Sequence, residues 1–115
     1  MWIRVALDRE SVHEGVVPEN TYVDGKNVKE YYFDDNIAYK LEQDGFLTEM
    51  WTKLDAIFDW GDCDYFSTEK SKAFKAWLEN RIERPMSPEL GPVYNNMLEL
   101  AKLAIQCGTG VAFDF

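Results

Sequence analysis

The chain has 115 residues, of which 46% are hydrophobic and 15% aromatic, and its 12 Lys and Arg against 21 Asp and Glu give a formal net charge of −9. This length predicts a single domain spanning residues 1–115, and the apolar content excludes a disordered chain. The acidic balance disfavours binding to nucleic acid or to an anionic membrane, because both require a basic surface.

The N-terminal residues and the cysteines indicate a cytoplasmic protein. Residues 1–8 lack the basic and long apolar regions of a signal peptide, and no apolar run reaches the roughly 18 residues of a membrane span. Cys63 and Cys107 are therefore expected to be free thiols. His13 is the one histidine and the chain has no glycine-rich phosphate loop, so neither a zinc site nor a cofactor is expected.

The first third of the chain predicts strands. Residues 2–7 alternate in a way that suits a strand with both faces partly buried. The dipeptide Asp24-Gly25 supplies the positive φ angles of a tight turn, which predicts a hairpin near 21–33 with a return strand over 28–33.

From Asp34 onward the apolar period becomes helical. Asp34 or Asp35 is expected to cap a short helix over 36–43, which ends at Asp44-Gly45. A second helix starts at Phe46 and is expected to continue until Gly61. Its apolar face consists of two overlapping stripes, which contain Phe46, Met50, Leu54 and Ile57 in one and Leu47, Trp51, Leu54 and Phe58 in the other.

The C-terminal half predicts two longer helices and a strand. Ser67 is a suitable cap for a helix over 68–82, and Pro92 suits the first turn of a helix that Gly108 ends. Residues 111–115 alternate and form a final strand. The predicted fold class is α+β: three to four helices packed on a small, mostly antiparallel sheet formed by the N-terminal strand, the hairpin near 21–33 and the C-terminal strand.

The negative charge is concentrated in one part of the sequence. Residues 34–69 hold 10 acidic and 2 basic side chains, so this segment has a net charge of −8 and the rest of the chain is nearly neutral. Tyr31 and Tyr32 precede Asp34 and Asp35, and we expect a strand end there with one tyrosine buried. The densest acidic and aromatic cluster lies over residues 58–66.

Three interpretations of residues 58–66 stay open at this point. The segment is a solvated loop between helices whose aromatic rings join the core, or it is a recognition edge in which aromatic anchors sit inside a rim of carboxylates. The third interpretation is a calcium or magnesium site, although the acids do not follow the EF-hand spacing.

The sequence gives little support for an enzyme. His13 and Cys63 could form a base and a nucleophile, but nothing in the sequence places them together. Paired carboxylates could do acid–base chemistry, but no pair is singled out by an apolar pocket. We therefore expect no catalytic residues and no metal ligands.

The charge pattern favours a small acidic binding protein. The leading hypothesis is an immunity-type inhibitor that neutralises a basic protein partner, such as a toxin nuclease, by covering its positively charged site. Alternatives are a phage-type inhibitor of a nucleic-acid-handling defence enzyme, a carboxylate-based metal-dependent enzyme, and an oligomeric structural subunit. The predicted partner-binding residues are Asp59, Trp60, Asp62, Asp64 and Tyr65, with Asp34, Asp35 and Asp55 as supporting charges.

Overall fold

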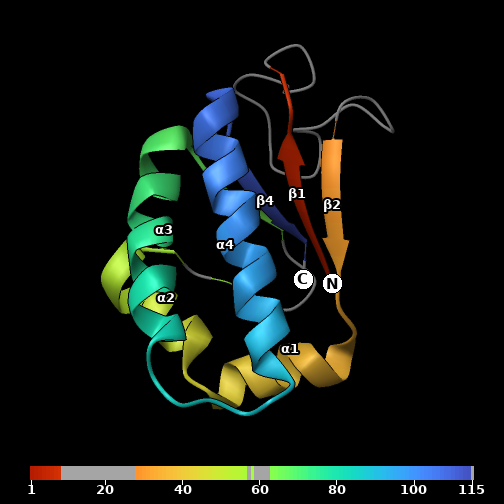
Figure 1. Ribbon diagram of the computed structural model, residues 1–115, viewed down its shortest axis with the longest axis vertical. Coiled ribbons are helices and arrows are strands. Elements are labelled where there is room, and N and C mark those ends of the chain that lie inside the picture. The colour runs from red at the N-terminus through yellow and green to blue at the C-terminus, as the bar shows by residue number, and fades with distance from the viewer. Residues whose placement is uncertain (9–27, 57, 59–62, 115) are drawn as a thin grey trace.

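A computed structural model describes residues 1–8, 28–56, 58 and 63–114 of the chain. The described part confirms the α+β prediction, with four helices and a four-stranded antiparallel sheet in the order β2-β1-β4-β3 (Figure 1). The strands are β1 (Trp2–Ala6), β2 (Val28–Tyr32), β3 (Cys63–Phe66) and β4 (Val111–Asp114).

The two ends of the described chain pair with each other inside the sheet. Trp2 of β1 lies opposite Tyr32 of β2 on one side and opposite Asp114 of β4 on the other. The predicted return strand and C-terminal strand are therefore confirmed, whereas residues 21–27 of the predicted hairpin lie outside the described residues. β3 was not predicted: residues 63–66, expected in a loop, pair with β4.

Two helices begin and end where local signals place them. In α1 (Asp35–Gln43), the Asp34 side chain caps the helix by accepting a hydrogen bond from the Ile37 N–H at 3.0 Å. In α3 (Thr68–Ile82), the Ser67 hydroxyl accepts one from the Lys70 N–H at 3.2 Å. Both caps satisfy backbone donors that a helix start leaves without an intrahelical partner.

The last helix, α4 (Leu90–Cys107), includes Pro92 in its first turn and ends at Gly108. Gly108 has a φ of 68°, which glycine adopts without a steric penalty.

The second helix, α2 (Phe46–Leu54), is shorter than predicted. Asp55 has a left-handed φ of 52°, and the following Ala56 N–H returns to the Met50 carbonyl at 3.1 Å, which ends the helix well before Gly61. Trp51, predicted in the core stripe, is 59% exposed. It lies one residue beyond the buried Met50, and one residue turns a helix by about 100°.

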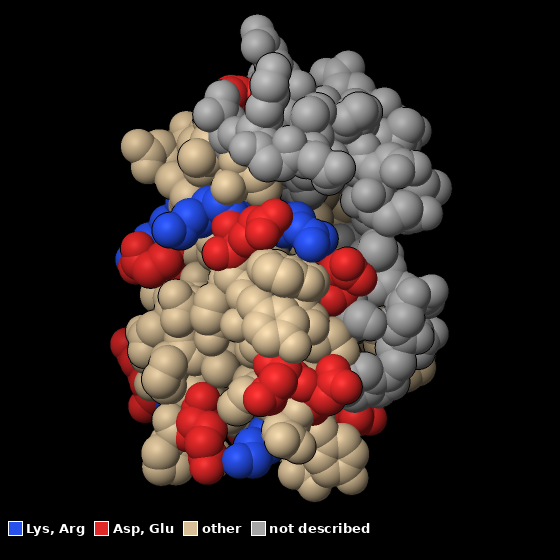
Figure 2. Space-filling model, turned by 90° about the vertical axis from the view of Figure 1, so that its right-hand side faces the viewer, with Lys and Arg blue, Asp and Glu red and all other residues tan. Residues whose placement is uncertain are grey.

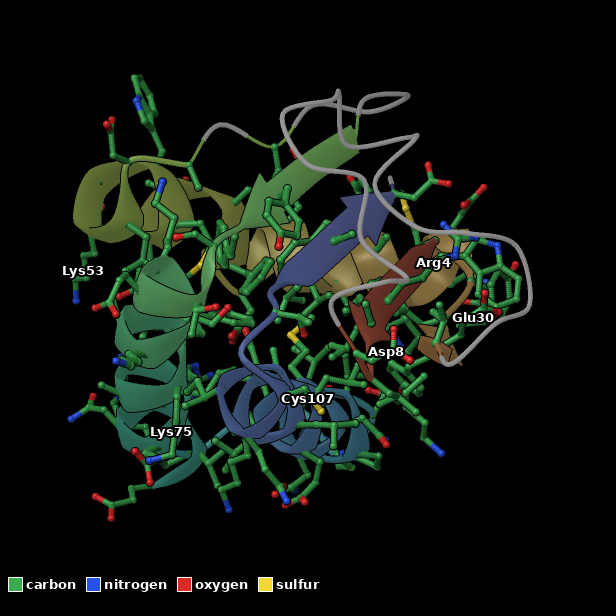
Figure 3. The ribbon with its side chains drawn as sticks, turned by 90° about the horizontal axis from the view of Figure 1, so that it is seen from above. Arg4, Asp8, Glu30, Lys53, Lys75 and Cys107 are labelled. Carbon is green, nitrogen blue, oxygen red and sulfur yellow. The ribbon has the colours of Figure 1, made fainter. Side chains whose placement is uncertain are left out.

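The helices α3 and α4 cover one face of the sheet (Figures 1 and 3). Alternate strand residues such as Val5, Phe66 and Phe113 point into the core between sheet and helices, where Phe66 and Phe74 of α3 meet edge-to-face at 5.2 Å between ring centroids. The opposite face of the sheet therefore carries the other alternate residues, among them the exposed aromatic side chains of Trp2 and Tyr32. None of the helices in the described ranges is long and apolar enough to cross a membrane.

Candidate protein-binding face

One acid of the 34–69 segment is used inside the fold. The Asp44 carboxylate accepts two hydrogen bonds from the Arg81 guanidinium, at 2.8 and 3.1 Å, and one from the Tyr94 hydroxyl at 2.6 Å. Burial by itself would raise the pKa of Asp44, but the hydrogen bonds from Arg81 and Tyr94 and the charge of Arg81 outweigh it and hold the pKa below its ordinary value. Asp44 therefore stabilises the fold rather than meeting a partner.

A second acid, Glu49 of α2, is also committed. It forms an ion pair with Lys53 at 2.9 Å and accepts a hydrogen bond from the Trp77 indole N–H at 3.4 Å. Burial by itself would raise the pKa of Glu49. The hydrogen bonds from Lys53 and Trp77 and the charge of Lys53 outweigh it and lower the pKa. Glu69 pairs with Lys72 at 3.0 Å on α3. The segment thus contributes less free negative charge than its composition indicates.

The centre of the predicted site falls mostly outside the described part of the chain. Asp59, Trp60 and Asp62 lie outside the described residues, and Asp64 is described only by its backbone in β3. Tyr65 of β3 is half-buried, and a Cβ atom added at Gly110 would lie 2.6 Å from its hydroxyl oxygen. Burial raises the pKa of Tyr65. A recognition edge over these residues stays a prediction.

The supporting carboxylates do not share one face. Asp34 and Asp35 lie where β2 leads into α1, whereas Asp55 follows α2, where its carbonyl accepts a hydrogen bond from the Lys70 ammonium at 3.4 Å. Figure 3 shows Lys53, near the end of α2, on the opposite side of the molecule from Glu30 of β2. The acidic segment is therefore divided between two sides of the fold.

An aromatic pair is exposed on the side of the sheet that faces away from the helices. Trp2 and Tyr32 are cross-strand neighbours whose ring centroids lie 5.0 Å apart, and they are 36% and 53% exposed. The Arg4 guanidinium lies 5.2 Å from the Trp2 ring centroid and pairs with Glu30 at 3.2 Å and Asp114 at 3.5 Å. These contacts hold the rings in place, so Trp2 and Tyr32 would lose little side-chain entropy when a partner binds them.

Acidic side chains follow Tyr32 closely in the chain. Chain alternation places Asp34 on the same side as Tyr32, and Asp35 shares one side of α1 with the exposed Tyr39, because residues four apart are neighbours on a helix. We call Trp2, Tyr32, Asp34, Asp35 and Tyr39 the β2–α1 face. Figure 2 shows the side of the molecule at the right of Figure 1, where an uncharged surface is bordered above and below by acidic side chains with basic ones among them.

Sequence reasoning found only part of the β2–α1 face. The charge pattern predicts Asp34 and Asp35 as supporting charges beside Tyr32, but it gives no indication of Trp2 or Tyr39. The strand over 2–7 was expected to be partly buried on both faces. The signal for Trp2 is its alternation with Ile3, which becomes informative only once the helices are known to cover one face.

Metal-binding groups and cysteine thiols were the other candidate sites among the described residues. Within residues 1–8, 28–56, 58 and 63–114, no group of three or more His, Cys, Asp or Glu side chains is placed to hold a metal ion. Cys107 is a free, half-buried thiol at the end of α4, while the side chain of Cys63 lies outside the described part.

Comparison of the chain with known protein families, with curated proteins and with solved structures gave no match.

Proposed function

We propose that this protein is an immunity-type inhibitor that covers the positively charged site of a basic protein partner, such as a toxin nuclease, and that it does so through the β2–α1 face. The observation that supports this most strongly is the exposed contact between Trp2 and Tyr32, next to Asp34 and Asp35. Aromatic anchors inside a polar rim are the residue types that dominate binding energy at protein interfaces.

The charge of the whole chain supports the same kind of partner. A net charge of −9 attracts a basic surface from a distance and raises the rate of association, while the exposed rings provide the contact that keeps the complex together. Asp34 and Asp35 form no ion pair within the described residues, so their charge is available to arginine and lysine side chains of a partner.

The test is affinity capture from the organism that carries the gene, followed by purification of the captured protein. We expect a basic protein whose affinity falls at least about tenfold between about 50 and 300 mM NaCl, because salt screens exposed charges. We expect Trp2→Ala or Tyr32→Ala to cost about 2 kcal/mol, which is a loss of affinity of about 30-fold. If the captured protein is a nuclease, its activity should fall as the complex forms.

Trp51→Ala is the matched control, because Trp51 is also an exposed tryptophan but lies on α2. It should leave binding unchanged if the β2–α1 face makes the contact. A loss of binding in Trp51→Ala but not in Trp2→Ala would move the interface to the side of Asp55. An acidic or neutral partner, or binding that does not depend on salt, would contradict the proposed function.

A further inference from the structure

The sheet has an unpaired edge at β2. Among the described strands β2 pairs only with β1, so its second edge faces away from the sheet. Figure 1 shows this edge at the right of the molecule, with no described helix or strand beyond it. Lys29, Glu30 and Tyr32 are exposed along the strand. Such an edge is a template on which a segment of another chain can pair.

The register identifies which backbone groups point outward. The Phe33 N–H donates to the Met1 carbonyl at 3.1 Å, one position beyond the Trp2–Tyr32 pair that ends the β1–β2 register. Hydrogen-bonded and non-bonded pairs alternate along an antiparallel ladder, so Glu30 and Tyr32 belong to non-bonded pairs. Their N–H and C=O groups therefore face the free edge.

A groove of about 450 Å³ lies beside this edge, between β2 and α4. Leu100 and Leu103 give it an apolar lining, Tyr31 forms its β2 side and hydrogen-bonds to Asn96, and Glu99 lies on its α4 side. Side chains of a strand alternate between its two faces. A strand added to β2 would thus direct every second side chain toward the groove and the others toward Glu30.

Charge favours a basic occupant over a second copy of this chain. The two acids that line the groove are already paired, Glu30 with Arg4 at 3.2 Å and Glu99 with Lys102 at 3.6 Å. The negative charge open to an occupant is that of Asp34 and Asp35, to which the strand leads directly and which form no ion pair within the described residues. Two copies would each bring a net charge of −9 and would repel each other. A segment that alternates basic and apolar residues matches both the carboxylates of Asp34 and Asp35 and the apolar lining of the groove.

We propose that the partner is held by β-strand addition: an extended, basic segment of the partner pairs with the free edge of β2, with apolar side chains in the groove and lysine or arginine side chains beside Glu30 and Asp34. This inference rests on the proposed function and specifies how the partner is bound. Backbone hydrogen bonds supply affinity in this mode of recognition, and alternate side chains supply specificity.

The first test is amide hydrogen exchange of the full chain, followed by NMR, with the synthetic peptide Lys-Val-Lys-Leu-Lys-Val-Lys as probe. The Glu30 and Tyr32 amides point outward and should exchange fast in the free protein. Saturating peptide should slow their exchange by at least about tenfold, because strand pairing protects amides that side-chain contact leaves open. A peptide of the same composition in the order Lys-Lys-Lys-Lys-Val-Leu-Val is the control and should not protect them.

Two substitutions at one position separate the backbone contribution from the charge. Glu30→Ala and Glu30→Pro both remove the carboxylate that pairs with Arg4, but only proline removes the outward N–H. We expect Glu30→Pro to bind the alternating peptide at least about tenfold more weakly than Glu30→Ala. Equal binding by the two variants would overturn the inference, and so would peptide binding without protection or no binding of the peptide.

The inference and the proposed function can fail separately. A basic partner that needs Trp2 and Tyr32 but leaves the Glu30 and Tyr32 amides unprotected would overturn strand addition and leave the inhibitor function standing. Protection that appears when the free protein is concentrated, without any peptide, would assign the edge to a second copy and also overturn the inference. A captured partner that is not basic contradicts the function, whatever the peptide does.

Discussion

At the scale of single residues, the contact between Asp44 and Arg81 shows what composition cannot reveal. The two lie 37 positions apart, and Arg81 is 5% exposed although it is charged. The guanidinium also donates to the carbonyls of Arg84 and Pro85, at 3.2 and 3.3 Å, so its donors are used both by a carboxylate and by the backbone after α3. A buried charge persists only with such partners.

Asp44→Asn should therefore destabilise the protein strongly. The substitution leaves the Arg81 charge buried without its counter-charge, which costs about 3 kcal/mol of the free energy of unfolding. Glu79→Gln is the matched control, because Glu79 pairs with Lys75 at 3.3 Å on the exposed side of α3 and such pairs contribute at most about 0.5 kcal/mol. Urea unfolding at neutral pH measures both. Equal losses in the two variants would show that Asp44 does not neutralise a buried Arg81 charge.

The stability lost in Asp44→Asn should also depend on pH. The folded pKa of Asp44 lies below its ordinary value of about 3.9, so its contribution is fully present above that value and is lost as pH falls through the folded pKa. The stability difference between wild type and Asp44→Asn should hence be constant from neutral pH down to about 5 and shrink below about 4. A difference that widens on acidification would contradict the assigned sign.

At the scale of elements, local signals were sufficient for α1 and α3 and insufficient for β3. Asp34 and Ser67 cap their helices through contacts three residues away, which a sequence shows directly. Residues 63–66 became a strand because β4, almost 50 residues later, pairs with them. The end of α2 was also missed, since the left-handed Asp55 is neither glycine nor asparagine and gives no stop signal.

Gly110, directly before β4, lies close to the backbone of β3. This contact gives a test of β3, the strand that the sequence did not predict. A Cβ atom at Gly110 would overlap the Phe66 carbonyl oxygen, which belongs to the backbone and cannot rotate away. Gly110→Ala should thus cost about 1–3 kcal/mol of stability. Gly91→Ala, in the first turn of α4 with nothing within 4 Å of the new atom, should stabilise by about 0.5 kcal/mol. A neutral Gly110→Ala in thermal unfolding would rule out this packing.

At the scale of the whole molecule, the acidic residues of the 34–69 segment have different roles and lie on different sides of the fold. The sequence concentrates acid in residues 34–69, and the fold uses Asp44 and Glu49 internally and sends Asp35 and Asp55 to different sides. A composition count could predict an acidic binder but not the direction from which a basic partner approaches. That direction depends on the sheet having helices on one face, which leaves Trp2 exposed beside the acids of α1.

Two charge-matched variants distinguish local attraction from overall attraction. Asp34→Asn/Asp35→Asn and Glu69→Gln/Glu79→Gln each raise the net charge of −9 by two, and asparagine still caps α1. Figure 3 shows Lys75 of α3 on the side away from Glu30, so the second pair lies far from the β2–α1 face. We expect the first variant to slow association with the captured partner at least about fivefold at low salt, measured by stopped flow, and the second to slow it little. Equal slowing by both would mean that the partner responds to the total charge, and that the β2–α1 face does not direct its approach.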